Sequence, residues 1–409
     1  MKILLIAYYY PPIASGGTER AVKMAAYLRR FGHEVWVLTQ TYQPSMQSTP
    51  SEIRVYDPSH NRHRVGIYTG QWLGLRLYTE LLNRLGIPHS IYSWWKGTVL
   101  KQAKSIVTSV KPEVILATYP PVEDLEIGLF LAQQFDLRLV ADFRDGFLYE
   151  PIETRFQKYT CLAAYYARIE QAVAEHASAV ITAFPTLSEY FSEKYDCQNV
   201  VTMTNGWDAE DFDQLPEEIP LDPAMFNIVH TGSVGGSYSR RDIRPLLEAL
   251  HHLLRHDPQL TSRLRVHFVG LLQPRELAAI RDLQHKGVII YHGMVPRKTA
   301  LAFQVKANLL LLITSSGRKG AAPGKLFEYL CAKTPVLALA SEGYTKDILE
   351  RTGVGWSVAA DDVHQIADLL SRIVSDQAFY ASLHRSEQEI AQFSRETQMR
   401  KLHEVLMTL

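Results

Sequence analysis

The chain has 409 residues and equal numbers of basic and acidic side chains, 43 of each, so its formal net charge is zero with histidine neutral. This length predicts two domains of ordinary size, and the charge balance argues against nucleic acid as a partner. The three cysteines, Cys161, Cys197 and Cys331, have neither disulfide nor zinc spacing, which favours a reducing cytosol. No run approaches the roughly 18 apolar residues that span a bilayer. We therefore expect a cytoplasmic protein, with any membrane contact peripheral and on the inner face.

The first half of the chain alternates short apolar runs with helical patterns. The apolar runs predict strands at Lys2–Ala7, Glu34–Thr39, Glu113–Thr118, Leu137–Ala141 and Ala179–Thr182. Thr18–Arg30 has the pattern of a helix between the first two strands. Because the runs are continuous rather than alternating, the strands should be buried on both faces, as in a parallel sheet.

The second half repeats this alternation. Strands are predicted at Asn227–His230, Arg265–Val269, Val288–Tyr291, Leu309–Ile313, Pro335–Ala340 and Gly355–Val358, and helices at Arg241–Arg255, Gln273–Lys286 and Pro296–Lys306. Right-handed crossovers between parallel strands then give two doubly wound domains. We therefore predict an α/β fold of two Rossmann-like domains that face each other across a cleft.

The domain boundary is predicted from composition. Residues 206–224 are acidic, contain Pro216, Pro220 and Pro223, and show no periodicity, which is typical of a linker. This gives an N-terminal domain at 1–205, a C-terminal domain at 225–390 and a final segment at 391–409. The final segment is amphipathic, and we expect a helix that returns toward the N-terminal domain. Ligands of open α/β sheets bind at the carboxyl ends of the strands, so we expect the site in the cleft.

The segment 321–330 has the pattern of an anion-binding helix start. It reads AAPGKLFEYL, follows a predicted strand and a basic, glycine-bearing loop, and places Lys325 and Glu328 early in a helix with Pro323 at its first position. A helix N-terminus beside one cation favours a phosphate group, and Glu328 could accept hydrogen bonds from neighbouring sugar hydroxyls. The alternative is an ordinary buried βαβ unit with two surface charges.

A second glycine-rich loop follows the first strand of the second half. It spans residues 230–236, and Arg240 and Arg241 come shortly after it. Arginine at a helix N-terminus is unfavourable for the helix dipole, which raises the expectation of an anion there. Together with Lys325, these arginines would surround one diphosphate. The alternative is a solvated helix start.

Glycines also open the first predicted helix. Gly16 and Gly17 come soon after the first strand, so the backbone there can approach a ligand closely. The sequence is not the G-x-G-x-x-G pattern of dinucleotide-binding domains. The alternative is a glycine turn with Thr18 as the helix cap.

Two buried strands of the first half end in residues that could contact a ligand. Asp142, Arg144 and Asp145 lie at the end of one strand, and Tyr119 ends the strand before it. Asp142 is either half of a structural ion pair or a ligand for an acceptor hydroxyl. Asp145 is a candidate catalytic residue, and Tyr119 should line the same edge of the sheet.

Asp211-Phe212-Asp213 has the D-x-D form that holds a divalent metal in some transferases. It lies in the acidic linker with no strand before it, so we interpret it as solvated chain. We predict no essential metal and no cofactor.

Residues 62–104 are basic and rich in tryptophan and leucine. One interpretation is a pair of helices whose aromatic side chains lie in the core. The other is a surface that contacts an anionic membrane. The basic residues are Arg62, Arg64, Arg76, Arg84, Lys96, Lys101 and Lys104, and the apolar ones are Trp72, Leu73, Leu75, Leu77, Tyr78, Trp94 and Trp95.

Several motifs resemble those of family 4 (group 1) retaining glycosyltransferases of the GT-B fold. They are YYYPP at 8–12, GGTER at 16–20, TNGWD at 204–208, KLFEYL at 325–330 and Pro335-Val336. The likeness covers essentially the whole chain. It implies a metal-independent, hexosyltransferase-like transfer of a sugar from a nucleoside diphosphate sugar such as a UDP-sugar, with retention at the anomeric carbon. It also implies that the C-terminal domain binds the donor and the N-terminal domain the acceptor.

The resemblance further assigns residues. Arg241 and Lys325 match the positive pair on the diphosphate, although lysine is more usual at the position of Arg241. Glu328 matches the ribose-binding second glutamate of the family's E-x7-E motif. Gly320 stands in place of the first glutamate, so we expect backbone amides of 320–323 to hold the sugar ring. Tyr119 takes the place of a histidine common in the family. The remaining donor-binding candidates are Gly16, Gly17, Gly232, Arg240, Met294, Val295 and Gly324, of which Met294 and Val295 would touch the base.

The implied reaction depends on charge. The leaving diphosphate gains charge as the glycosidic bond breaks, and fixed cations stabilise that state. With no obvious enzymic nucleophile, we expect a same-face attack assisted by the departing phosphate. The acceptor would be a glycan or a lipid-phosphate-linked sugar in surface polysaccharide or glycolipid synthesis.

Two other functions stay open. One is a non-catalytic, nucleotide-sugar-binding partner of a glycosyltransferase, because the first glutamate and the histidine of the family are missing. The other is a GT-B epimerase, which would need a catalytic histidine and paired carboxylates.

Overall fold

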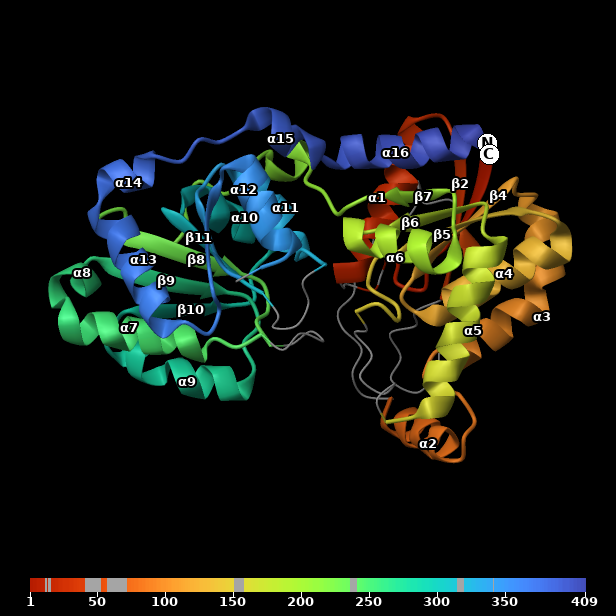
Figure 1. The fold of residues 1–409 in the computed structure, drawn as a ribbon, viewed down its shortest axis with the longest axis horizontal. Coiled ribbons are helices and arrows are strands. Elements are labelled where there is room, and N and C mark those ends of the chain that lie inside the picture. Colours follow the sequence, from red (N-terminus) through yellow and green to blue (C-terminus); the bar gives the residue numbers. More distant parts are fainter. Residues whose placement is uncertain are drawn as a thin grey trace. The chain divides into compact units, whose positions relative to one another are not determined.

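The computed structural model describes residues 1–11, 13, 16–40, 53–56, 72–150, 158–235, 241–314, 320–340 and 342–409. Within them the chain divides into two compact units: Met1–Thr204 with Glu396–Leu409, and Asn205–Arg395. Each unit is built on one β-sheet with helices packed against it (Figure 1). The predicted pair of Rossmann-like domains is therefore confirmed.

The sheet of the first unit has the strand order β3-β2-β1-β4-β5-β6-β7. Its pairings are parallel except for β2 with β3. The strands are β1 (Lys2–Ile6), β2 (Glu34–Gln40), β3 (Ile53–Tyr56), β4 (Val114–Tyr119), β5 (Arg138–Phe143), β6 (Ala179–Thr182) and β7 (Val200–Thr202). The sequence pattern did not predict β3 and β7.

Seven helices are described in the first unit, of which the last comes from the far end of the chain. They are α1 (Gly16–Arg30), α2 (Trp72–Arg84), α3 (Ser93–Val110), α4 (Val122–Phe135), α5 (Thr160–His176), α6 (Pro185–Tyr195) and α16 (Arg395–Thr408). Met399, Leu402 and Leu406 of α16 are buried in one cluster with Met24 and Leu28 of α1. The predicted return of the C-terminal helix to the N-terminal domain is therefore confirmed.

The second unit has a six-stranded sheet in the order β10-β9-β8-β11-β12-β13, with every pairing parallel. This is the doubly wound order, in which ligands bind where the strand order reverses, here beside β8 and β11. The strands are β8 (Phe226–Thr231), β9 (Leu264–Val269), β10 (Ile289–Gly293), β11 (Leu309–Ile313), β12 (Val336–Leu339) and β13 (Gly355–Val358).

The structure describes ten helical segments in this second unit. They are the 3-10 helix η2 (Ala209–Phe212), α7 (Arg244–His256), α8 (Pro258–Ser262), α9 (Pro274–His285), α10 (Arg297–Lys306), α11 (Gly324–Ala332), α12 (Tyr344–Thr352), α13 (Val363–Ser375), α14 (Gln377–Ala381) and α15 (Glu387–Gln392). Of the helices that the structure describes in both units, none combines the length and apolar character needed to cross a membrane.

The acidic segment predicted as a solvated linker belongs to the second unit and is anchored to it. The Asp211 carboxylate lies 2.8 Å from the guanidinium of Arg297. Lys298 donates hydrogen bonds to the backbone carbonyls of Asp211 (3.0 Å) and Asp213 (2.6 Å). The interpretation of Asp211 as solvated chain was therefore wrong, because the start of α10 supplies two cations that hold it.

Candidate functional site

Lys325 and Arg241 approach each other at the Ser233 carbonyl. Lys325 Nζ lies 3.4 Å from this oxygen, and a guanidinium nitrogen of Arg241 lies 3.2 Å from it. The sheet explains the approach, because β8 and β11 are adjacent and parallel and the loops after their carboxyl ends emerge side by side. The sequence thus correctly predicted that these two cations lie together.

Gly232 provides the space for this arrangement. It follows β8 directly and has φ +87°, a left-handed conformation that favours glycine. A Cβ atom at this position would lie 3.1 Å from Lys325 Nζ. A larger residue would therefore crowd the ammonium group as well as strain the backbone.

The ammonium of Lys325 is held in surroundings that oppose its charge. Burial, and then the neighbouring Arg241 guanidinium, lower the pKa of Lys325 to about 7, while Glu328 acts in the opposite direction. An anion bound here would favour the charged lysine. The arrangement of two neighbouring cations is therefore suited to a ligand such as a phosphate group.

The helix that carries Lys325 begins one residue later than predicted. Pro323 is the residue before the helix, with φ −61° and ψ 139°, and Gly324 is the first helical residue. Gly324 is exposed and Gly320 is buried. Lys325 and Glu328 lie on α11 one turn apart, as the sequence predicted.

Glu328 is the centre of a polar network. One carboxylate oxygen lies 3.0 Å from the guanidinium of Arg297, and the other accepts a hydrogen bond from the Gln304 amide at 3.3 Å. Gln304 also donates to the hydroxyl of Thr231, at the end of β8. Sequence reasoning missed Arg297, although its place at the start of α10, just after Met294 and Val295, was a signal that could have found it.

Three other donor-side candidates have different surroundings. Met294 is 73% exposed, and Val295 is half-buried. Arg240 lies outside the described residues.

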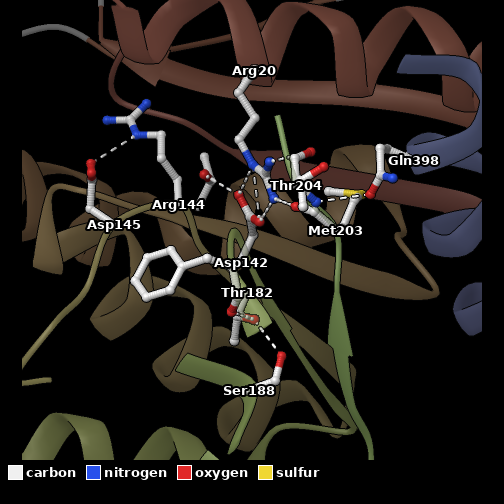
Figure 2. Close-up of polar contacts among 11 residues, drawn as sticks. Arg20, Asp142, Arg144, Asp145, Thr182, Ser188, Met203, Thr204 and Gln398 are labelled. Carbon is white, nitrogen blue, oxygen red and sulfur yellow. Dashed lines mark hydrogen bonds and ion pairs between the residues drawn. The ribbon is translucent and has the colours of Figure 1, made fainter. Parts of the chain in front are cut away.

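In the first unit, Asp142 forms a buried ion pair. Its carboxylate accepts from Arg20 at 2.6 Å and from the Thr118 hydroxyl at 2.7 Å, and the side chain is completely buried (Figure 2). Arg20 also donates to the carbonyls of Met203 (2.9 Å) and Thr204 (3.3 Å). The acceptor-binding role predicted for Asp142 is corrected, because its carboxylate is enclosed and saturated by the protein.

Gly17 and Arg144 lie against each other in the same unit. A Cβ atom on Gly17 would collide with the Arg144 guanidinium. Arg144 also donates to the Pro120 carbonyl at 3.2 Å and lies over the ring of Tyr9. Its Nε lies 3.7 Å from the Asp145 carboxylate (Figure 2). The glycine at position 17 therefore makes room for the Arg144 guanidinium.

The two remaining candidates of the first unit differ in accessibility. The Asp145 side chain is 25% exposed, so solutes can reach it. Tyr119 is 4% exposed, and its ring packs edge-on against Phe147 with centroids 4.7 Å apart. Tyr119 ends β4 at the predicted edge, but its ring belongs mainly to the core. Gly16 is the first residue of α1.

The described residues contain no group of three or more histidine, cysteine, aspartate or glutamate side chains placed to hold a metal ion.

Comparison with protein-family models gives two matches, one in each half of the chain. Residues 15–206 match a family described as "Glycosyl transferase 4-like domain", and residues 226–376 match one described as "Glycosyl transferases group 1". Comparison with curated protein sequences finds no match.

Several solved structures resemble the whole chain at low sequence identity. Sucrose-phosphate synthase from Thermosynechococcus elongatus has a TM-score of 0.68 at 17% identity, over 99% of this chain and 98% of that one. HepE from Anabaena in complex with UDP has a TM-score of 0.63 at 16% identity, and UDP-GlcNAc 2-epimerase from Methanocaldococcus jannaschii has 0.56 at 10%, both over 100% of each chain. At such identities the likeness shows the fold alone.

Proposed function

Because the chain belongs to the group 1 glycosyltransferases, we propose that it transfers a sugar from a UDP-sugar to a hydroxyl group of its acceptor with retention of configuration. The second unit would bind the donor, and the first unit the acceptor. We further propose that the acceptor is a glycan or a lipid-phosphate-linked sugar in surface polysaccharide or glycolipid synthesis.

The observation that carries this proposal is the meeting of Lys325 and Arg241 at the Ser233 carbonyl. Two cations held within reach of one point match a pyrophosphate, whose charge grows as the bond to the sugar breaks. The Anabaena neighbour is described in complex with UDP and with UDP-glucose, which supports a uridine nucleotide as the first to test.

The same residues suggest the course of the reaction. The bond between the anomeric carbon and the diphosphate oxygen would break, leaving UDP between Lys325 and Arg241. The acceptor hydroxyl would attack the same face of the sugar and pass its proton to the departing phosphate oxygen. We propose that these cations neutralise the diphosphate without an essential metal.

Glu328 would bind the ribose of the donor. Its carboxylate is already oriented by Arg297 and Gln304. The backbone of 320–323 would hold the sugar ring, and Met294 and Val295 would contact the base. A carboxylate fixed by two partners keeps lone pairs that can accept from ribose hydroxyls.

A second candidate function is a non-catalytic partner that binds nucleotide sugars. Gly320 favours it, because the family's first glutamate is missing there. Release of UDP from a UDP-sugar distinguishes the two. We expect slow release without acceptor, and thermal stabilisation by UDP-sugars that bind. Stabilisation by several UDP-sugars with no release, even with candidate acceptors present, would contradict the enzyme.

The exposed face of α2 supports the proposed membrane contact. Leu77, Leu81 and Leu85 are 63%, 54% and 65% exposed, and recur every fourth residue along one side of the helix and its end. Arg76 and Arg84 are exposed beside them. Trp95, by contrast, is completely buried, so this predicted aromatic belongs to the core. Part of the segment 62–104 lies outside the described residues.

Vesicle sedimentation tests this contact. We expect binding to vesicles that contain anionic lipid, and its loss when Leu77 and Leu81 are both replaced by serine. Met407→Ser, at an equally exposed apolar residue of α16, is the matched control. Equal, negligible binding to anionic and neutral vesicles would contradict the proposal.

A further inference from the structure

His230 lies directly behind Lys325 in the second unit. It is on β8 and is completely buried. Its Nδ1 atom lies 3.0 Å from the carbonyl oxygen of Leu311, on the adjacent strand β11. A carbonyl oxygen can only accept, so Nδ1 carries the hydrogen of the imidazole.

The other ring nitrogen faces the lysine. His230 Nε2 lies 3.2 Å from Lys325 Nζ. With the hydrogen on Nδ1, the lone pair of Nε2 accepts a hydrogen bond from the ammonium. Burial, and then the charges of Lys325 and Arg241, lower the pKa of His230 well below its usual value, so the ring is neutral at physiological pH.

We propose that His230 is a positioning residue for donor binding, whose neutral imidazole holds the Lys325 ammonium in place for the diphosphate. This inference rests on the proposed function. Nε2 of His230 and the Ser233 carbonyl take two of the three N–H bonds of the ammonium, and the third serves the ligand.

A neutral acceptor suits this task better than a carboxylate would. Lysine has a flexible four-carbon stem, so its ammonium needs an anchor to stay in one place. A carboxylate would anchor it and also cancel its charge, whereas an imidazole leaves the positive charge for the diphosphate. The other charged groups that act on Lys325 are Arg241, which opposes its charge, and Glu328, which favours it.

Two substitutions separate the hydrogen bonds of His230. In His230→Asn the amide nitrogen takes the place of Nδ1 and can still donate to Leu311, but the side chain is too short to reach Lys325. In His230→Gln the longer side chain brings its amide oxygen to the place of Nε2, where it can accept from Lys325. The comparison therefore isolates the contact with the lysine.

The test measures affinity for UDP, thermal unfolding, and the pH dependence of the affinity. We expect UDP to bind His230→Asn about tenfold more weakly than wild type, and His230→Gln within about threefold of it, with similar melting temperatures for both variants. Above about pH 7 the affinity should fall as Lys325 loses its proton. That fall should begin at lower pH in His230→Asn, because the charged lysine has lost an acceptor.

The outcomes distinguish this inference from the function on which it rests. Wild-type affinity and an unshifted pH profile in His230→Asn, with Lys325→Met abolishing UDP binding, would overturn the role of His230 alone. Equal losses in the asparagine and glutamine variants, in proportion to lowered melting temperatures, would show a merely structural histidine and would also overturn it. No UDP binding by the wild type would remove both proposals.

Discussion

The two units treat buried charge in opposite ways. In the first unit, Asp142 and Arg20 are opposite charges in direct contact. The Asp142 carboxylate also accepts a hydrogen bond from Thr118, and the Arg20 guanidinium also donates one to the Met203 carbonyl. In the second unit, Lys325 and Arg241 are like charges that meet at a neutral carbonyl, and the lysine is supported by a neutral histidine. In the first arrangement the two charges neutralise each other, so the pair needs no ligand and stabilises the fold. In the second arrangement two positive charges lie together and attract an anion. This contrast distinguishes a structural ion pair from a binding site.

The largest expected effect is a loss of stability when the ion pair between Asp142 and Arg20 is broken. Asp142→Asn leaves Arg20 buried without its counter-charge, so we expect the free energy of unfolding to fall by about 3–5 kcal/mol in urea titrations. Affinity for UDP of the folded variant should be unchanged, since Asp142 is not a ligand.

A matched control is available in the same unit. Glu396 and Arg400 form an exposed pair on α16, 2.8 Å apart, and Glu396→Gln should cost less than about 1 kcal/mol. If Asp142→Asn costs no more than this control, or if it weakens UDP binding while leaving stability intact, the assignment of the two charge clusters is wrong.

Removing one of the two cations of the second unit, Lys325 or Arg241, should lower activity and leave stability nearly unchanged. Lys325→Ala should lower turnover of the donor by about 100- to 1000-fold, because a fixed cation facing the leaving diphosphate is lost. The melting temperature should stay near that of wild type, since removing one of two like charges relieves repulsion. Lys346→Ala, at a partly exposed lysine of α12, is the control and should leave turnover unchanged. Near-normal turnover by Lys325→Ala would remove the lysine from the site.

The pH dependence of the reaction sharpens the comparison. The pKa of Lys325 is lowered to about 7, so the lysine is charged below that pH and loses its charge above it. We therefore expect kcat/KM for the donor to fall as the pH rises above about 7, by up to tenfold per pH unit. In Lys325→Arg the guanidinium does not titrate, so this fall should be absent, whatever the activity of the variant. A decline that persists in Lys325→Arg would belong to another group.

The features that depend only on the strands and their order could be predicted from the sequence. The predicted strands Leu309–Ile313, Ala179–Thr182 and Gly355–Val358 coincide with β11, β6 and β13. The meeting of Lys325 and Arg241 follows from the adjacency of β8 and β11, which the doubly wound order implies.

The partners of individual side chains could not be predicted from the sequence. Asp142 has Arg144 two residues away, yet its partner is Arg20, 122 positions earlier. Which of the two arginines points to Asp142 depends on the packing of α1 against the sheet, and that packing leaves Arg144 near Asp145 instead. His230 was noticed only as part of a glycine-rich loop. Its role depends on the Leu311 carbonyl and Lys325, which belong to other elements.

The most direct test is a crystal structure of the protein with UDP bound. We expect the oxygens of the diphosphate to lie within hydrogen-bonding distance of Lys325 Nζ and of the Arg241 guanidinium, with His230 Nε2 still in contact with the lysine. A diphosphate bound elsewhere, with the two cations still directed only at the Ser233 carbonyl, would contradict the account.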